Sequence, residues 1–249
     1  MNFPLKTPKQ IEIMREGGLI LANIMGEMLN MVKPGVKLID IDKLADDLIV
    51  KAGGEASFKK VRDYQWATCI NINEGVVHGI PNEYQIRDGD VVSIDIGILY
   101  KGFNTDMSWS VVAGTSNNSK QRFLHAGEET LSLAIAASKD GNRIGDISKV
   151  IENNLKKYGY RPVKELTGHG VGEELHEEPM IPGVLRQEIG KTPLLQEGMT
   201  LALEIIYAEG NPAIVLTDDN WTIETEDRSL AGLFEKTIVV RKGNPLVLT

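Results

Sequence analysis

The sequence predicts an α+β fold built from two related halves around an antiparallel sheet. In each half two amphipathic helices precede two apolar strands that carry acidic residues, and the order is the same in residues 1–115 and 116–249. Helices grouped ahead of strands favour this class over alternating strand–helix units. We expect one domain over residues 1–249, with its halves related by a pseudo-two-fold axis, where pockets commonly form.

The helices are predicted from apolar residues at a period near 3.6 and from the breakers that end them. Thr7-Pro8 is a start signal, and Lys33-Pro34-Gly35 is a stop signal. The four expected helices cover residues 8–32, 39–54, 119–141 and 145–160. The glycines that flank the second helix of each half are 18 residues apart in both halves, at 35 and 53 and at 141 and 159.

The strands repeat in the same order. DGDVVSID (88–95) matches EGMTLALE (197–204), since each has an acid, a glycine, five residues and a second acid. DMSWSVVAG (106–114) matches EKTIVVRKG (235–243) more loosely, with an acid eight residues before a glycine. Each match is weak alone, and the shared order indicates a duplicated helix–helix–strand–strand unit.

Two acidic residues interrupt apolar strands. Asp95 lies in VVSIDIGILY and Glu204 lies in MTLALEIIY. An ionised carboxylate in a buried strand is costly unless it is paired or binds a metal. An ion pair or a solvent-facing strand would explain one such acid, but four acids at matching places in two repeats favour a cation site.

Strand register supports this interpretation. Asp95 and Asp106 flank Lys101-Gly102, which suits a two-residue hairpin turn. In that register Asp95 faces Ser108 and Asp106 faces Gly97, so both aspartates point to one face as diagonal neighbours roughly 7–8 Å apart.

The second half supplies the corresponding pair, Glu204 and Glu235. Four carboxylates meeting across the axis would repel one another, and some would stay protonated. Two divalent ions would neutralise them.

The histidines of GHGVGEELHEEP, His169 and His176, are seven residues apart. This spacing and the surrounding glycines exclude the helix that presents two zinc-binding histidines four residues apart. On a strand the odd spacing puts them on opposite faces, so we expect one as a ligand and the other reaching in from a loop. His78 lies in a third glycine-flanked loop, whereas His125 is expected on a solvated helix surface.

Bulk properties exclude several classes of protein. The 249 residues are 42% hydrophobic and 25% charged, with a net charge of −8, which predicts a soluble chain with no DNA partner. The single cysteine, Cys69, excludes an internal disulfide and a Cys-x-x-Cys zinc module. The chain shows no signal peptide and no apolar run of membrane-spanning length, so we expect a cytoplasmic protein without membrane contact.

At these residues the sequence resembles the type I methionine aminopeptidases. The resemblance covers nearly the whole chain, and its motifs are NINEGVVHGIP, DGDVVSIDIG, the Asp106 strand, GHGVGEELHEEP, the Glu204 strand, WTIETEDRSLAG and FEKTIVV. It implies the pita-bread (creatinase/aminopeptidase) fold, which agrees with the inferred duplication. It also implies removal of the initiator methionine from nascent proteins and peptides whose second residue is small.

Matched position by position, the resemblance implies a dinuclear metal site and three catalytic residues. The implied ligands are Asp95, Asp106, His169, Glu204 and Glu235, with Asp106 and Glu235 bridging the ions. A hydroxide held between two divalent ions would attack the scissile carbonyl, and this ligand set suits Mn, Fe(II) or Co. The implied catalytic residues are His78, His176 and Glu204, with Glu204 as the proton acceptor. The implied substrate-binding residues are His78, His176, Tyr64, Cys69 and Trp221.

Some positions depart from the usual pattern of that family. Leu175 replaces an aromatic residue of the methionine pocket, and Phe58 replaces a cysteine. Ile205 and Lys236 replace a proline and a histidine that follow ligand positions. None of these changes removes an implied ligand, but together they put the shape and strictness of the pocket in question.

Two other functions remain open. One is a prolyl (Xaa-Pro) aminopeptidase or prolidase of the same fold, and the other is a non-catalytic binding protein that has lost its metal. The retained ligands argue against the second. The expected partners are nascent polypeptide N-termini and the ribosome, although no motif indicates ribosome contact, and the expected state is a monomer.

Overall fold

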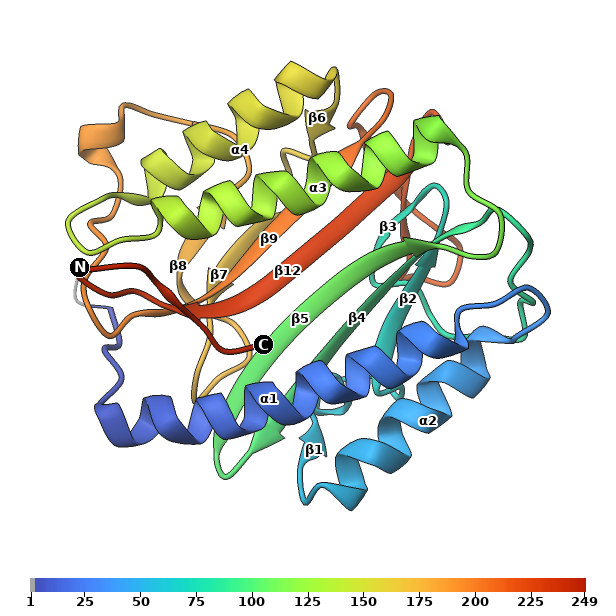
Figure 1. Ribbon diagram of the computed structural model, residues 1–249, viewed down its shortest axis with the longest axis horizontal. Coiled ribbons are helices and arrows are strands. Elements are labelled where there is room, and N and C mark those ends of the chain that lie inside the picture. Colours follow the sequence, from blue (N-terminus) through green and yellow to red (C-terminus); the bar gives the residue numbers. More distant parts are fainter. Residues whose placement is uncertain (1–2) are drawn as a thin grey trace.

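The computed structural model describes residues 3–249 as a curved sheet covered on one face by helices (Figure 1). The described chain has four α-helices, α1 (Pro8–Met31), α2 (Leu38–Lys51), α3 (Asn118–Ala137) and α4 (Ile144–Tyr158). All four predicted helices are therefore confirmed, with ends that differ by a few residues. Thr7 caps α1 with a capping box, and Gly159 ends α4 in the left-handed region.

The main sheet has the strand order β1-β4-β5-β12-β9-β7-β8, and β2, β6 and β13 pair at its edges. A smaller sheet has the order β10-β11-β3. The strands are β1 (Glu55–Ala56), β2 (Thr68–Ile72), β3 (Gly75–Val77), β4 (Val91–Tyr100), β5 (Phe103–Val112), β6 (Arg161–Pro162), β7 (Thr167–Gly170), β8 (Glu177–Pro182), β9 (Thr200–Ala208), β10 (Ile214–Leu216), β11 (Ile223–Thr225), β12 (Ala231–Val239) and β13 (Leu246–Val247).

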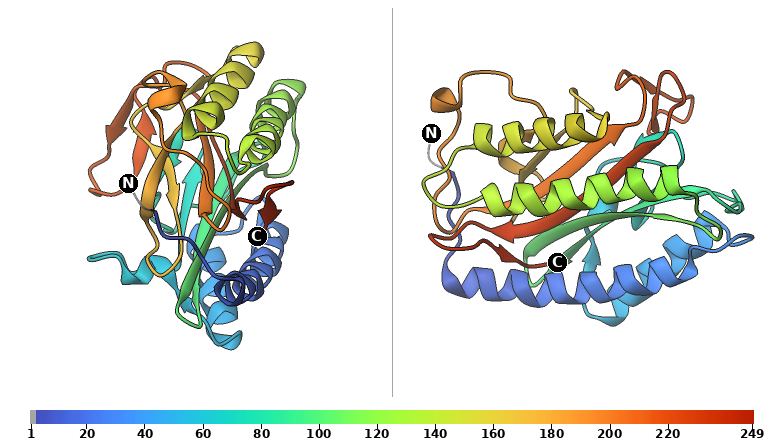
Figure 2. Two further views of the ribbon diagram at one scale, coloured as in Figure 1. Left: turned by 90° about the vertical axis from the view of Figure 1, so that its left-hand side faces the viewer. Right: turned by 45° about the horizontal axis from the view of Figure 1, so that its top comes forward.

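The two halves meet where β5 pairs with β12. On either side of this seam lie β4 and β9, each with a helix pair on the same face of the sheet (Figures 1 and 2). One apolar core joins α1 and α2 to β4, and a second joins α3 and α4 to β9. Helices on one side leave the other face of the sheet free to carry a site.

The predicted hairpin and its register are confirmed. Tyr100 pairs with Phe103 across Lys101 and Gly102, which both have positive φ as a tight two-residue turn requires. Asp95 pairs with Ser108, as predicted from the sequence.

The second half differs from the simple repeat. Its strands β9 and β12 are separated by the β10–β11 hairpin instead of a tight turn. Because β9 and β12 still pair, Glu204 and Glu235 are direct partners and not diagonal neighbours. Strands β4 and β9 match the apolar runs VVSIDIGILY and MTLALEIIY to within one residue, whereas β5 and β12 begin three and four residues ahead of Asp106 and Glu235.

Close packing of α3 on the sheet depends on a glycine. A Cβ atom at Gly127 would lie 2.3 Å from a ring carbon of Phe234 and 2.7 Å from the Tyr207 hydroxyl. Both aromatic side chains are fully buried, so neither can move aside without displacing other core residues.

We therefore expect Gly127→Ala to lower the free energy of unfolding by about 1–3 kcal/mol, the usual cost of overpacking. Gly26→Ala is the matched control on α1, because nothing lies within 4 Å of its added Cβ. There the better helix propensity of alanine should stabilise by up to about 1 kcal/mol. Denaturant midpoints of the two variants should shift in opposite directions, and equal shifts would contradict the packing argument.

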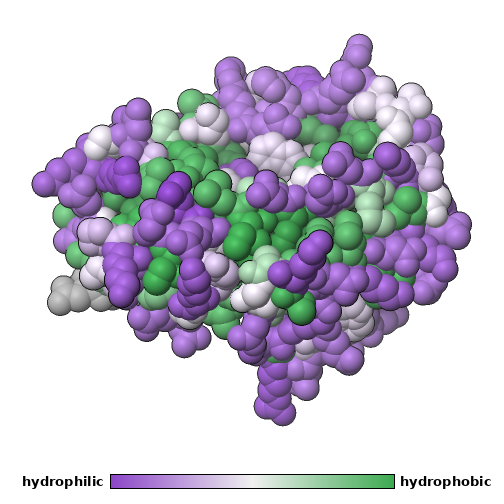
Figure 3. All heavy atoms as spheres, turned by 60° about the horizontal axis from the view of Figure 1, so that its bottom comes forward, coloured by the Kyte–Doolittle hydropathy of each residue, from purple (hydrophilic) through white to green (hydrophobic). Residues whose placement is uncertain are grey.

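On the face that Figure 3 shows, hydrophilic residues cover most of the surface and hydrophobic residues gather in a band across the middle. Such exposure is ordinary, since more than half of the surface of a typical protein is apolar. Within the described residues, no helix is both long and apolar enough to cross a membrane.

Candidate active site

The acidic residues of four central strands share the face of the sheet that is opposite to the helices. In antiparallel pairs, direct partners lie on one face, and so do residues two apart. Asp95 and Glu235 both pair with Ser108, and Glu235 also pairs with Glu204. Asp106 is two residues from Ser108. Backbone register alone therefore brings all four carboxylates to one face.

The same register adds a histidine and the cysteine. His169 pairs with Ala202, two residues from Glu204. Cys69 pairs with Asp95 at the opposite end of the group. A pocket opens over these residues and includes them all in its lining.

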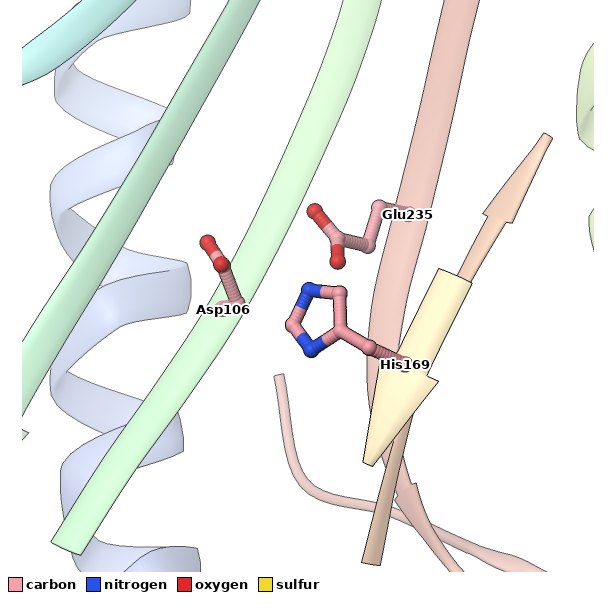
Figure 4. A group of neighbouring side chains, drawn as sticks. All are labelled: Asp106, His169 and Glu235. Atoms are coloured by element: carbon pink, nitrogen blue, oxygen red, sulfur yellow. The ribbon is translucent and has the colours of Figure 1, made fainter. Parts of the chain in front are cut away.

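Three of these side chains are close enough to hold one metal ion. Asp106, His169 and Glu235 each offer a ligand atom, and the three atoms lie within 4.8 Å of one another. Their side chains point toward one another from β5, β7 and β12 (Figure 4). The three residues are only 2–3% exposed. Asp95 and Glu204 flank them and are half-buried.

The hydrogen bonds of His169 define its tautomer. Its Nδ1 lies 2.8 Å from the carbonyl oxygen of Gly170, which only accepts, so Nδ1 carries the hydrogen. Its Nε2 lies 3.3 Å from Oε1 of Glu204. Burial opposes protonation of His169, but the hydrogen bond and the charge of Glu204 outweigh burial and raise the pKa of His169. Because Nδ1 carries the hydrogen, Nε2 is the ring atom available to a cation.

The carboxylates fit a cation because they lack other partners. One oxygen each of Asp95, Asp106 and Glu235 is buried without a hydrogen bond. Burial and neighbouring negative charge raise the pKa of Asp95 and of Glu235 well above their usual values. Burial also raises the pKa of Asp106 to about 7, although His169 opposes this. Orphaned, mutually repelling carboxylates beside an imidazole form a donor set suited to a divalent metal.

An aromatic wall closes the other side of the pocket. Tyr64 lies edge-on to both Trp66 and Trp221, at centroid distances of 5.3 and 5.0 Å. Phe58, Tyr64 and Cys69 form a buried apolar cluster with Leu175 and Trp221 packed against it. The pocket therefore offers an apolar compartment directly beside the polar donors.

Two more histidines line the pocket from loops. His176 lies edge-on to His169, with ring centroids 4.4 Å apart. Burial and the neighbouring His169 and His78 lower the pKa of His176 to about 4, so its ring is neutral at pH 7. The His78 side chain is open to the pocket, yet the surrounding protein lowers its pKa as well.

The structure brings every predicted site residue to this one pocket. His125 is exposed on α3, as expected. The pocket also includes residues that were not predicted to contact substrate. Phe58 and Leu175 were noted only as departures from the family pattern, and Val61 and Val77 carried no sequence signal.

Comparisons with known proteins find relatives over nearly the whole chain. The model of metallopeptidase family M24 matches residues 12–242. The methionine aminopeptidase of Aquifex aeolicus is 36% identical, with 100% of this chain and 99% of the relative aligned. That of Mycoplasma capricolum is 37% identical over 98% of this chain and 97% of the relative.

Solved structures extend the comparison. The crystal structure of a methionine aminopeptidase from Thermotoga maritima covers 100% of this chain at 34% identity with a TM-score of 0.96. The prolidase of Pyrococcus horikoshii, at 23% identity and a TM-score of 0.79, shares the fold, and this chain covers 63% of it. The predicted pita-bread fold is confirmed by these structures. The chain belongs to metallopeptidase family M24.

Proposed function

We propose that this protein is a metal-dependent aminopeptidase that removes methionine from peptides and nascent proteins whose second residue is small. The observation that carries the proposal is the juxtaposition in one pocket of a buried donor set and an apolar aromatic wall. The donors suit a hydrolytic metal centre, and the wall suits an unbranched apolar side chain such as that of methionine. Full-length relatives named methionine aminopeptidase support the same activity.

In this proposal the two divalent ions would be held by Asp95, Asp106, His169, Glu204 and Glu235. Asp106 and Glu235 lie on β5 and β12, the two strands at the seam, and would contribute donors from both halves. Four carboxylates and one imidazole favour Mn, Fe(II) or Co. When bound, such ions supply Lewis-acid polarisation of the scissile carbonyl and activation of a water molecule.

The protein side chains supply proton transfer and orientation. Glu204 is half-buried at the pocket edge and accepts the proton of the attacking water. His176, neutral at pH 7, donates its ring N–H to the scissile carbonyl oxygen as negative charge develops there. His78 contacts the second residue of the substrate.

The substrate enters with its amino terminus toward the carboxylates. The free amino terminus of the substrate would be held at the metal site, which would restrict cleavage to the first residue. Tyr64, Cys69 and Trp221 contact the methionine side chain, together with Phe58 and Leu175. Nascent polypeptides in the cytoplasm are the proposed substrates of a monomeric enzyme that meets them at the ribosome.

Release of free methionine from Met-Ala-Ser tests the proposal. Metal-free protein is loaded with Mn, Fe(II) or Co, and Leu-Ala-Ser, Met-Leu-Ser and Ala-Pro-Ala serve as controls. We expect metal-dependent release from Met-Ala-Ser at rates at least about ten-fold above those of the controls. A substrate side chain that differs from the preferred one by a single methylene group already lowers the rate by about that factor.

The controls separate the alternatives. Release from Ala-Pro-Ala instead would place the chain with the prolyl enzymes that share its fold. Binding of metal without release from any peptide would support a non-catalytic protein.

A further inference from the structure

The loop of residues 171–177 carries His176 into the pocket. It connects β7 to β8, and Gly170 pairs with Glu177 at its base. The His176 ring lines the pocket and stays accessible to solvent there, so its place over the metal donors depends on the loop backbone.

A buried ion pair from a distant segment anchors this loop. Nζ of Lys6 lies 2.6 Å from Oε2 of Glu177, the residue that follows His176. The two side chains are 4% and 11% exposed. In the other lysine–carboxylate pairs of residues 3–249, every side chain is at least 32% exposed. Burial strengthens such a pair against screening, and loss of one partner leaves an uncompensated charge.

Lys6 is itself fixed in place. Its backbone N–H donates to the carbonyl oxygen of Gly198 at 2.8 Å. Its side chain crosses the loop so closely that a Cβ atom at Gly172 would lie 2.2 Å from Lys6 Cε. The second oxygen of Glu177 accepts from the backbone N–H of Glu174 at 3.3 Å. The Glu177 carboxylate therefore binds both Lys6 and the backbone at Glu174, and so connects the end of the loop to its middle.

The start of the loop has a separate anchor. The side-chain amide of Asn104 donates to the carbonyl oxygens of Gly172 and Glu173, both at 3.1 Å. Ser57 donates its hydroxyl to Asn104 at 2.8 Å. Loss of Lys6 would leave this anchor intact and free only the end that carries His176.

We propose that Lys6 is a positioning residue that, through its buried ion pair with Glu177, fixes the 171–177 loop so that His176 faces the scissile carbonyl. This role rests on the proposed function. It gives a reason for the contact between the segment that precedes α1, which carries Lys6, and the 171–177 loop of the second half. Lys6 lines no part of the pocket and touches no reacting atom.

Lys6→Met keeps the length of the side chain and removes its charge. We expect kcat for Met-Ala-Ser to fall about 10–100-fold, because small displacements of a group that acts in the transition state cost that much. KM should change less than about three-fold, since His176 stabilises the transition state and not the bound substrate. Lys6→Arg should recover most of the rate by restoring the ion pair.

A double-mutant cycle with His176→Ala separates positioning from general damage. If Lys6 acts through His176, Lys6→Met should cause little further loss in the His176→Ala background. Lys37→Met is the matched control, because Lys37 pairs with Glu83 at the same 2.6 Å on an exposed surface, and its rate should stay unchanged. Equal losses from Lys6→Met in both backgrounds would overturn the proposal.

Histidine ring signals in the NMR spectrum give a readout that needs no activity. Lys6→Met should shift or broaden the His176 signal, assigned by its absence in His176→Ala. The His125 signal should stay fixed as an internal reference, since His125 is exposed on α3. An unchanged His176 signal would overturn the positioning role. Absence of methionine release by the wild-type protein would instead contradict the proposed function, and the NMR comparison would still decide the role of Lys6.

Discussion

Glu204→Gln is expected to reduce methionine release at least about 1,000-fold while leaving the protein folded. General-base catalysis contributes up to about 10⁴-fold, and an amide of the same shape cannot accept the proton. Glu204 also lies 3.3 Å from Nε2 of His169, so the substitution removes a negative donor from the proposed metal site as well. The measurement is kcat/KM for Met-Ala-Ser at saturating metal, with metal content determined on the same samples.

Glu209→Gln is the matched control for this substitution. Glu209 is exposed, follows the same strand and lies outside the pocket lining, so its loss should leave the rate within about two-fold, as for most surface changes. Thermal unfolding should show that both variants remain folded. Retention of a tenth or more of wild-type activity by Glu204→Gln would contradict the role assigned to Glu204.

The shared face of the first two carboxylates could be predicted because it depends on local geometry. A two-residue turn at Lys101 and Gly102 fixes the register of β4 and β5, and the two-residue period of a strand then decides the face. No knowledge of the rest of the chain is needed. The same reasoning does not reach the register of Glu204 and Glu235, because the β10–β11 hairpin intervenes and their direct pairing is a long-range contact.

The arrangement of the histidines shows a second limit. The odd spacing of His169 and His176 correctly excluded one strand presenting both rings, but it did not place them in contact. The bend of the chain between β7 and β8 brings the rings to a centroid distance of 4.4 Å. A strand pattern predicts alternation within a strand, whereas the path of the 171–177 loop depends on anchors elsewhere, such as Lys6.

The apolar wall was predictable only through the family resemblance. Its members come from the 3-10 turn Ser57–Lys60, the segment between that turn and β2, strand β2, the 171–177 loop and the segment before β11. Single aromatic residues in loops are usually packing residues, and no spacing rule joins segments more than 150 residues apart. Tertiary packing therefore decides which of them reach the pocket.

Removal of the metal ions is expected to abolish activity and to make the contribution of Asp106 to the stability of the protein fall as pH rises from about 4 to about 7. Without a cation, the buried Asp106 carboxyl has a pKa of about 7 in the folded protein, against 3.8 for an ordinary aspartate. The folded state then binds the proton more tightly than the unfolded state. The resulting stabilisation is complete below pH 3.8 and is lost as pH rises through about 7. For this one group the loss is on the order of 4 kcal/mol.

Thermal unfolding of chelated and Mn-loaded protein across this pH range measures the effect. Bound cations replace the proton as the partner of the carboxylates, so the difference in Tm between loaded and chelated protein should widen toward neutral pH. Asp106→Asn is the matched variant, because an uncharged amide cannot titrate, and its chelated form should lose much less stability over the same range. If the chelated wild-type and Asp106→Asn proteins showed parallel pH profiles, Asp106 would not be the protonated group of the empty site. The carboxylates that destabilise the chelated protein at neutral pH are the proposed metal donors, so the proposed site lowers the stability of the metal-free protein in order to bind the cation.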